Sequence, residues 1–241
     1  MDAIITLSQL YPAVFYSLVF FVSLMVGSFL NVVIYRLPIM MERSWQQEYQ
    51  SYFSEGAPTP HDKNSSASEE VFNLVKPDST CPSCGHKIRA WENVPVISYL
   101  FLKGKCAKCK VGISVRYPLV ELFTALACTF AAYQFGVTSQ ALWAVLFTYI
   151  LVALLFIDLD KMLLPDQLTL PLLWLGLLLS TQHIFVGTTD AIIGAAAGYL
   201  SLWSVYWLFK LATGKEGMGY GDFKLLAALG AYTGWQGLPI I

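Results

Sequence analysis

The sequence predicts an all-α polytopic membrane protein with about six transmembrane helices and a small cytoplasmic domain. Three observations predict this fold class: a high apolar content, repeated apolar runs, and one long polar interruption that holds four of the five cysteines. Of the 241 residues, 56% are hydrophobic and 13% are charged, whereas soluble domains carry about 25% charged residues. The net charge of −1 gives no reason to expect a nucleic-acid partner.

The apolar runs place the expected transmembrane helices, each of which needs about 20 mostly apolar residues. The first run has neither the basic segment before it nor the small-residue cleavage site of a signal peptide, so we expect it to be retained. The low-complexity stretch 54–70 is expected to be a flexible loop. The candidate spans are residues 11–35, 118–136, 139–157, 167–187, 190–212 and 222–241. The chain is accordingly divided into a first transmembrane helix (1–36), a cytoplasmic domain (37–117) and a membrane core (118–241).

The basic residues predict the orientation of these helices. Most of the 15 Lys and Arg residues lie in 36–117, and the connections near 137–138 and 187–190 contain none. Positively charged loops stay on the cytoplasmic side, so we expect the N-terminus outside and the polar domain in the cytoplasm. The connections 157–166 and 214–222 then lie on the cytoplasmic face too.

Two aspartates are expected at this cytoplasmic face. Asp158 ends the third span, and Asp222 begins the sixth within "GMGYGDFKLL" (217–226). Two carboxylates that share one proton can act as general base and general acid, which is the mechanism of aspartic proteases. An ionisable residue inside a membrane segment is a candidate for function. The glycines before Asp222 allow a substrate to approach the backbone closely.

Other interpretations of these acids remain open. An aspartate in the first turn of a helix often only caps it, which applies to Asp222 and, before the fourth span, to Asp166. Asp160 lies close to Asp158, and the residues alone do not decide which of them pairs with Asp222. The same acids would also suit a proton or ion transporter, with Glu121 as a further polar partner, or a membrane scaffold without chemistry.

The four paired cysteines predict a structural zinc site. Cys81 and Cys84 form one C-x-x-C pair, and Cys106 and Cys109 form the other. Two such pairs can hold zinc tetrahedrally, as in a zinc ribbon, and the reducing cytoplasm argues against disulfides. A redox pair or a nucleic-acid-binding ribbon are alternatives. A zinc protease is not expected, because there is no H-E-x-x-H and a four-cysteine site leaves no position for water.

Other side chains near this site have weaker interpretations. The three histidines lack ligand spacing, although His86 is near enough to Cys84 to be a substitute ligand or to support the site. Cys128 lies in an apolar run and is expected to be a core residue. The lysines around the second cysteine pair are expected to meet anionic lipid headgroups. They are Lys103, Lys105, Lys108 and Lys110.

Several segments resemble one known family in the expected order. "GYGD" matches the G-x-G-D signature of intramembrane aspartyl proteases. Three further segments resemble bacterial type IV prepilin peptidases: 27–38, 81–109 and 156–179. In that family the first catalytic aspartate belongs to the "ID" pair that ends a helix. The resemblance therefore assigns Asp158 and Asp222 as the catalytic pair, with Asp160 in reserve.

The resemblance also implies an activity and its partners. It implies cleavage of the basic leader from prepilins and pseudopilins of type IV pili and type II secretion, at the cytoplasmic face of the bacterial inner membrane. It implies N-methylation of the new N-terminus with S-adenosylmethionine, for which residues 91–100 are the segment to search. The leader's basic residues are expected to meet acidic groups such as Glu42, Glu92, Asp160 or Glu216. The family usually continues for several tens of apolar residues beyond Ile241, so we expect relatives to be longer.

Overall fold

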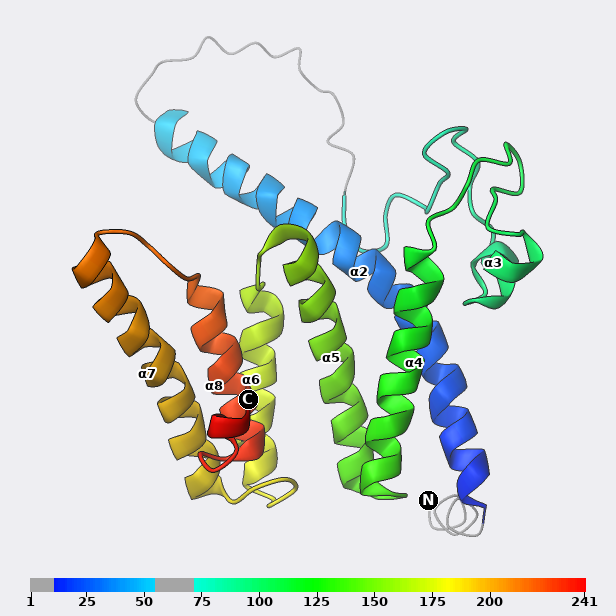
Figure 1. The fold of residues 1–241 in the computed structure, drawn as a ribbon. Helices are drawn as coiled ribbons and strands as arrows, with labels where there is room; N and C mark the ends of the chain where they lie inside the picture. The colour runs from blue at the N-terminus through cyan, green and yellow to red at the C-terminus, as the bar shows by residue number, and fades with distance from the viewer. Residues whose placement is uncertain (1–10, 55–71) are drawn as a thin grey trace. The chain divides into compact units, whose positions relative to one another are not determined.

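The structure is a computed structural model that describes residues 11–54 and 72–241 (Figure 1). Most of the loop expected at 54–70, together with His61, lies outside the described residues. The chain divides into two compact units, Phe21–Leu126 and a second unit that combines Met1–Phe20 with Ala127–Ile241. We call them the module unit and the core unit.

The described residues are helical apart from turns and two isolated bridges. All six expected apolar runs form helices, so the predicted fold class is confirmed. The longer helices are α2 (Pro12–Ser54), α4 (Arg116–Phe135), α5 (Ser139–Lys161), α6 (Asp166–Ser180), α7 (Thr188–Thr213) and α8 (Tyr220–Thr233). The shorter ones are η1 (Ala90–Asn93), α3 (Ile97–Phe101) and η2 (Leu238–Ile240).

Four helices are long and apolar enough to cross a membrane, namely α2, α4, α5 and α7. The other two are shorter than their apolar runs: α6 has 15 residues and α8 has 14. A span needs about 20 residues, so these two are too short to cross a bilayer as straight helices. The helix α8 stops because Gly234 has a φ of 72°, a conformation that ends helices.

The first helix continues well beyond its apolar run. The helix α2 extends to Ser54, with Pro38 inside it, and it changes direction along its length (Figure 1). A proline inside a helix removes one backbone hydrogen bond and bends the axis. Next to it, the buried Arg36 donates hydrogen bonds to the carbonyls of Asn73 and Pro77, at 2.9 and 2.7 Å. The segment before the cysteines is thereby fixed to α2.

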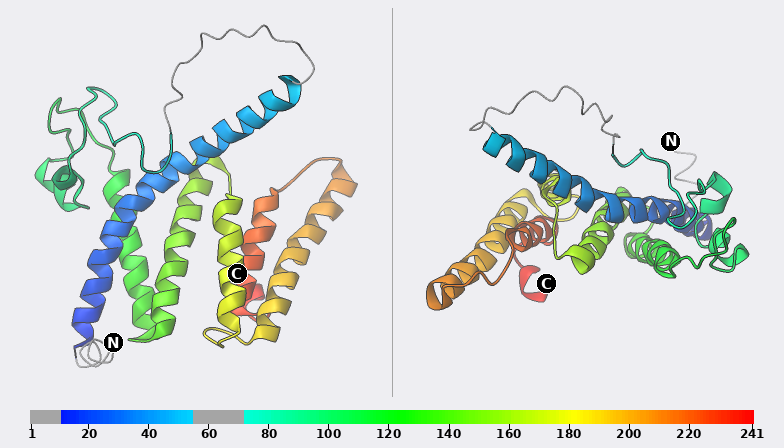
Figure 2. Two further views of the ribbon diagram at one scale, coloured as in Figure 1. Left: turned by 180° about the vertical axis from the view of Figure 1, so that it is seen from behind. Right: turned by 90° about the horizontal axis from the view of Figure 1, so that it is seen from above.

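In the core unit, α8 packs between α6 and α7 (Figures 1 and 2). The backbones of α7 and α8 meet at Gly194 and Gly230, where a side chain on either residue would clash with the backbone of the other helix. Small residues permit such close approach between membrane helices. On its other side, Tyr232 of α8 packs with Leu154 and Leu172 in a buried cluster. These contacts hold the short α8 in place.

In the module unit, one hydrogen bond connects the cysteine-bearing segment to α4, and another connects α2 to α4. The buried Glu121 of α4 accepts the backbone N–H of Val96 at 2.8 Å. Asn31 of α2 donates to the carbonyl of Tyr117 at 3.1 Å. At Gly27 of α2 a side chain would clash with the backbone of Glu121. The segment therefore rests directly on the first turns of α4.

Candidate active site and metal centre

Asp158 lies in the last turn of α5. The helix ends because Met162 adopts a left-handed conformation, with a φ of 49°, and its N–H donates to the Asp158 carbonyl at 2.8 Å. Pro165 then precedes α6, where its fixed φ suits a helix start. This short turn leaves the Asp158 side chain exposed at the end of the helix.

Asp222 lies in the first turn of α8, three residues after the N-terminal cap Gly219. Its carboxylate accepts the backbone N–H of Gly219, which is one half of a capping box. The negative charge of Asp158 acts on the same carboxylate. Asp222 therefore caps its helix and also lies near the first aspartate.

Asp158 and Asp160 both lie near the end of α5. Residues two positions apart on an α-helix point about 200° apart. The charge of Asp158 acts on the Asp222 carboxylate, which favours Asp158 as the partner of Asp222. Both aspartates are exposed, so burial does not separate them.

An ion pair that the sequence analysis missed joins the two helix starts beside Asp222. Lys224 donates to both carboxylate oxygens of Asp166, each at 2.7 Å. A cation is unfavourable near the N-terminus of a helix, and this unfavourable position was the sequence signal that could have found Lys224. Close by, Gly221 leaves no room for a side chain against Leu164. The two contacts fix the start of α8 against the turn between α5 and α6.

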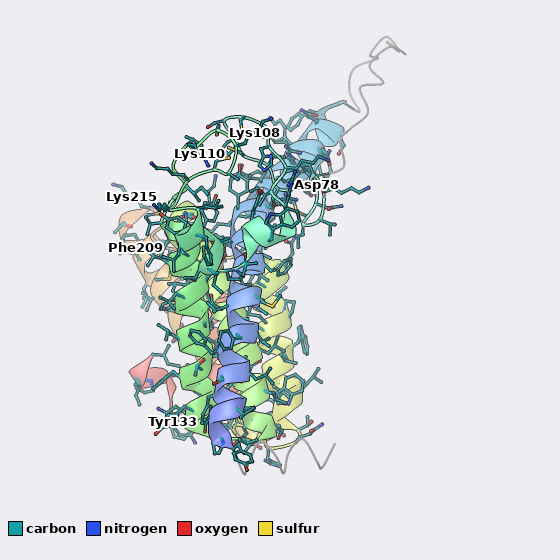
Figure 3. All side chains as sticks on the ribbon, turned by 90° about the vertical axis from the view of Figure 1, so that its right-hand side faces the viewer. Asp78, Lys108, Lys110, Tyr133, Phe209 and Lys215 are labelled. Atoms are coloured by element: carbon teal, nitrogen blue, oxygen red, sulfur yellow. The ribbon has the colours of Figure 1, made fainter. Side chains whose placement is uncertain are left out.

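A second unpredicted cluster shapes the connection between α7 and α8. Lys210 donates to Glu216 at 2.9 Å and to the hydroxyl of the buried Tyr206 at 3.3 Å. The hydroxyl of Tyr220 lies 3.4 Å from that of Tyr206. The hydrogen bond from Lys210 lowers the pKa of the Glu216 carboxyl. Figure 3 shows Phe209 and Lys215 at this end of the unit, and a side chain at Gly217 would clash with the Phe209 ring.

The four paired cysteines converge on one point in the module unit. Their sulfur atoms all lie within 4.8 Å of one another. The sulfurs of Cys81 and Cys109 are 3.8 Å apart, and those of Cys84 and Cys106 are 4.0 Å apart. All four are free thiols, which makes them a candidate metal site. The fifth, Cys128, is buried in the core unit as expected.

Each cysteine pair lies in a turn with the same hydrogen bonds. The Cys81 N–H donates to the backbone carbonyl of His86 at 2.9 Å, and the Cys106 N–H donates to the backbone carbonyl of Val111 at 2.8 Å. Lysines labelled in Figure 3, Lys108 and Lys110, lie on the second turn. The backbone N–H groups of Cys109 and Lys108 lower the pKa of the Cys106 thiol to about 6. A thiolate at this position is ready to bind a metal ion at neutral pH.

His86 is not a fifth ligand of this cluster but a neighbour of it. Its Nε2 atom lies 3.0 Å from the Glu92 carboxylate, which also accepts the backbone N–H of Arg89. The hydrogen bond from the Arg89 N–H, with a smaller contribution from His86, holds the pKa of the Glu92 carboxyl below its usual value. Glu92 and Glu216 thus already have cationic or hydrogen-bonding partners within the chain, which weakens the expectation that they receive a substrate's basic residues.

Two family models cover most of the chain. Residues 21–135 match the bacterial peptidase A24 N-terminal domain. Residues 145–241 match the type IV leader peptidase family. The cysteine cluster lies in the first matched region, and Asp158 and Asp222 lie in the second. No solved structure matches the chain.

Relatives from several bacteria match over nearly the whole chain. Proteins named prepilin leader peptidase/N-methyltransferase are 59% identical in Aeromonas salmonicida and 58% in Aeromonas hydrophila, over 100% of this chain and 81% of theirs. One from Pseudomonas putida is 55% identical over 95% of this chain and 76% of its own length. The chain therefore belongs to the prepilin leader peptidase/N-methyltransferase family.

Proposed function

We propose that this protein is an intramembrane aspartyl endopeptidase that removes the basic leader from type IV prepilins and pseudopilins, and then N-methylates the new N-terminus. The observation that carries the peptidase activity is the approach of Asp158 and Asp222 at adjoining helix ends, in a chain of this family. The proposed site faces the cytoplasm at the bacterial inner membrane, with the N-terminus outside, because the basic residues concentrate on that side.

In the proposed mechanism the two carboxyl groups share one proton. Repulsion between them prevents both from being ionised, so one is a carboxylate and the other an acid. The carboxylate takes a proton from water, and the water attacks the scissile carbonyl. The acid donates its proton to the carbonyl oxygen, which gives a tetrahedral intermediate. The first carboxyl group then passes its proton to the amide nitrogen as the C–N bond breaks, and the second takes back a proton from the intermediate's hydroxyl. Asp158 is exposed and Asp222 is half-buried, and both lie at helix ends, where water and an extended leader can reach them.

The surrounding residues would position this pair. The Gly219 N–H holds one orientation of the Asp222 carboxylate. The Asp166–Lys224 ion pair and the close contact at Gly221 set where α8 begins relative to the end of α5. Catalysis depends on such placement, since a displacement of about 1 Å can cost 100-fold in rate.

For the cysteine cluster we propose a structural zinc ion. A tetrahedral site with zinc–sulfur bonds of about 2.3 Å has sulfurs about 3.8 Å apart, and the cluster has 3.8 and 4.0 Å. Such a site is closed to water, so its role is to hold the two turns together. The methyl group would come from S-adenosylmethionine, with residues 91–100 of the same module as the segment to search for its contacts.

The first test is cleavage of a purified prepilin by the wild-type chain and by Asp158→Asn, Asp222→Asn and Asp160→Asn variants in detergent. Loss of a general acid or base typically costs at least about 100-fold, so cleavage should fall by that much in the first two variants. Asp160→Asn is the matched comparison and should retain kcat, with any change confined to KM, because Asp160 is expected at most to bind the leader. Cleavage that survives in Asp158→Asn but not in Asp160→Asn would reverse the assignment of the first aspartate.

The transporter alternative makes the opposite prediction for these variants. A relay would be revealed by proton flux in vesicles that the aspartate substitutions abolish, with prepilin cleavage absent from the wild type. The relatives lend it no support, because they are named as peptidases and methyltransferases. Normal cleavage in both Asp158→Asn and Asp222→Asn would leave Asp222 as a helix cap and refute the proposed peptidase site.

A further inference from the structure

The short helix α3 carries an apolar face that none of the described residues of the module unit covers. Ile97, Leu100 and Phe101 are 47%, 67% and 84% exposed, and none of the five residues of α3 is buried. They are spaced i, i+3 and i+4, so they share one face of the helix. Leucine and phenylalanine at such exposure, next to one another, indicate a surface that contacts an apolar partner.

This face belongs to a segment that is hydrogen-bonded to a candidate membrane span. Val96, which caps α3, donates its N–H to Glu121 of α4. The helix α4 begins at Arg116 and is long and apolar enough to cross a membrane. At 1.5 Å per residue, Glu121 lies about 7 Å along α4 from its first residue. Figures 1 and 2 show α3 alongside the upper turns of α4.

Basic residues follow α3 directly. Lys103 and Lys105 are exposed, and neither forms an ion pair within the described part of the chain. Amphipathic helices that lie in a membrane interface bury their apolar face about 5–10 Å deep and carry lysines that meet anionic headgroups. The hydrogen bond between the α3 segment and a candidate membrane span, the apolar face of α3 and the adjacent lysines agree with this arrangement.

We propose that α3 is an interfacial anchor, with Ile97, Leu100 and Phe101 in the acyl-chain boundary of the bilayer and Lys103 and Lys105 at the phosphates of anionic lipids. The anchor lies in the same segment as the Val96–Glu121 hydrogen bond, so lipid and protein contacts together fix the module against the membrane. Two other occupants of the face, namely another protein surface and water, give different outcomes in the test below.

The test measures the depth of position 101 in lipid nanodiscs that contain phosphatidylglycerol. Phe101 is replaced by p-acetylphenylalanine, whose ketone accepts a spin label without involving the cysteines. Accessibility of the label to oxygen and to a soluble nickel chelate is then measured by electron paramagnetic resonance. Labels at Phe130 of α4 and at Asp78 serve as references, since both residues are exposed and Phe130 lies within a candidate membrane span.

We expect the label at 101 to favour oxygen over nickel, with a depth between those of the labels at 130 and 78. Nickel accessibility equal to that at 78 would mean that the face is in water. Exclusion of both reagents would mean that protein covers it. Either result would overturn the proposal.

A second arm tests the lysines. In phosphatidylcholine nanodiscs the oxygen preference at 101 should fall by about twofold, because the attraction between lysine and anionic lipid is lost. The Lys103→Gln/Lys105→Gln double variant should show the lower oxygen preference at position 101 in both lipids. A Lys215→Gln control should show the same oxygen preference as the labelled protein without this substitution. An oxygen preference that ignores lipid charge would refute the assigned role of the lysines.

A third measurement needs no substitution in α3. Amide hydrogen exchange over 97–101 of the unmodified chain should be about tenfold slower in phosphatidylglycerol than in phosphatidylcholine nanodiscs, since a helix held in the interface opens less often. Equal exchange in the two lipids would contradict the anchor without any concern about misfolded variants.

Discussion

At the residue scale, the two cysteine turns have the same hydrogen bonds but different residues at their strained position. Gly85 follows Cys84 with a φ of 65°, and Lys110 follows Cys109 with a φ of 61°. Glycine adopts this left-handed conformation without a steric penalty, whereas other residues cost about 1–2 kcal/mol there. The left-handed backbone is therefore unstrained in the first turn and strained in the second.

Substitution of Gly85 by alanine should destabilise the module by about 1 kcal/mol. A side chain at Gly85 would have open space around it, so the loss comes from the backbone conformation alone. Thermal unfolding of the metal-loaded protein measures it. Gly112→Ala is the matched control, because Gly112 also has open space but no positive φ. Equal effects of the two substitutions would contradict this explanation.

Removal of the Tyr232 hydroxyl is expected not to destabilise the protein, in contrast to the Gly85 substitution. It is buried without a hydrogen-bond partner within the described residues. An unsatisfied buried polar group is unfavourable, so Tyr232→Phe should leave stability unchanged or raise it by up to about 1 kcal/mol. Thermal unfolding in detergent is the measurement.

Tyr206→Phe is the control for that experiment. The Tyr206 hydroxyl is buried too but contacts Lys210 and Tyr220, so its removal should cost about 1 kcal/mol. A larger loss of stability in Tyr232→Phe than in Tyr206→Phe would show that Tyr232 has a partner in the membrane.

The residues that the sequence identified are those with a local pattern. Asp222 follows alternating glycines, and the cysteines come in two short pairs, so spacing alone singled them out. The choice between Asp158 and Asp160 needed the family resemblance, because the direction of a side chain depends on how the helices pack. The Lys210–Glu216 ion pair was missed since both residues look like ordinary charges of a cytoplasmic loop.

At the scale of elements, the Asp166–Lys224 pair joins the starts of α6 and α8. Asp166 stands in the first turn of α6, where a negative charge is favourable, and it compensates Lys224 near the start of α8. The Asp166 and Lys224 side chains are 52% and 28% exposed, so solvent screens the pair. We therefore expect it to contribute more to the position of Asp222 than to the stability of the protein.

This expectation can be tested with Asp166→Asn, Lys224→Met and the double variant. Each single variant should lower kcat for prepilin cleavage by about tenfold with little change in KM, because the aspartates are displaced while the leader still binds. The double variant should be no worse than either single variant. Stability should change by less than about 1 kcal/mol.

Lys224→Arg and Asp166→Glu provide the conservative controls and should retain most of the cleavage. Additive losses in the double variant would show that the two residues act separately. A rise in KM at unchanged kcat would instead place the pair in leader binding.

Helix boundaries were harder to predict than helix positions. The apolar run 222–241 predicted one span, but α8 ends at Thr233 because Gly234 takes a positive φ, which composition does not reveal. The extension of α2 to Ser54 could not be read from hydropathy, since its second half is polar. Hydropathy detects the part of a helix in lipid and not the part beyond it.

At the scale of the whole molecule, the two proposed chemistries belong to different units. The cysteine cluster lies in Phe21–Leu126, and both aspartates lie in the unit that includes Ala127–Ile241. Metal removal should therefore impair methylation and the stability of the module more than it impairs cleavage. The order of the cysteine pairs and the two aspartates in the sequence was predictable from the motifs, whereas their separation into two compact units required the structure.

The corresponding experiment compares both activities after metal removal. Dialysis against a chelator should remove the metal. The substitution Cys84→Ser should lower metal affinity by more than about 100-fold, since loss of a ligand costs more than loss of a residue that supports one. Methylation should be lost under these conditions and return when zinc is added to the chelated wild type. Loss of cleavage and methylation at the same chelator concentration would show that the units do not act independently.

The shortness of α8 has a consequence for how the protein is made. With 14 residues, it is a poor substrate for the insertion machinery, which favours segments that span the bilayer alone. Its glycine contact with α7 and its aromatic contact with α6 are available only after those helices are in the membrane. Under the proposed mechanism, Asp222 then approaches Asp158 late in biogenesis. A nascent chain lacks the proposed catalytic pair and is unable to cleave other membrane proteins before it has folded.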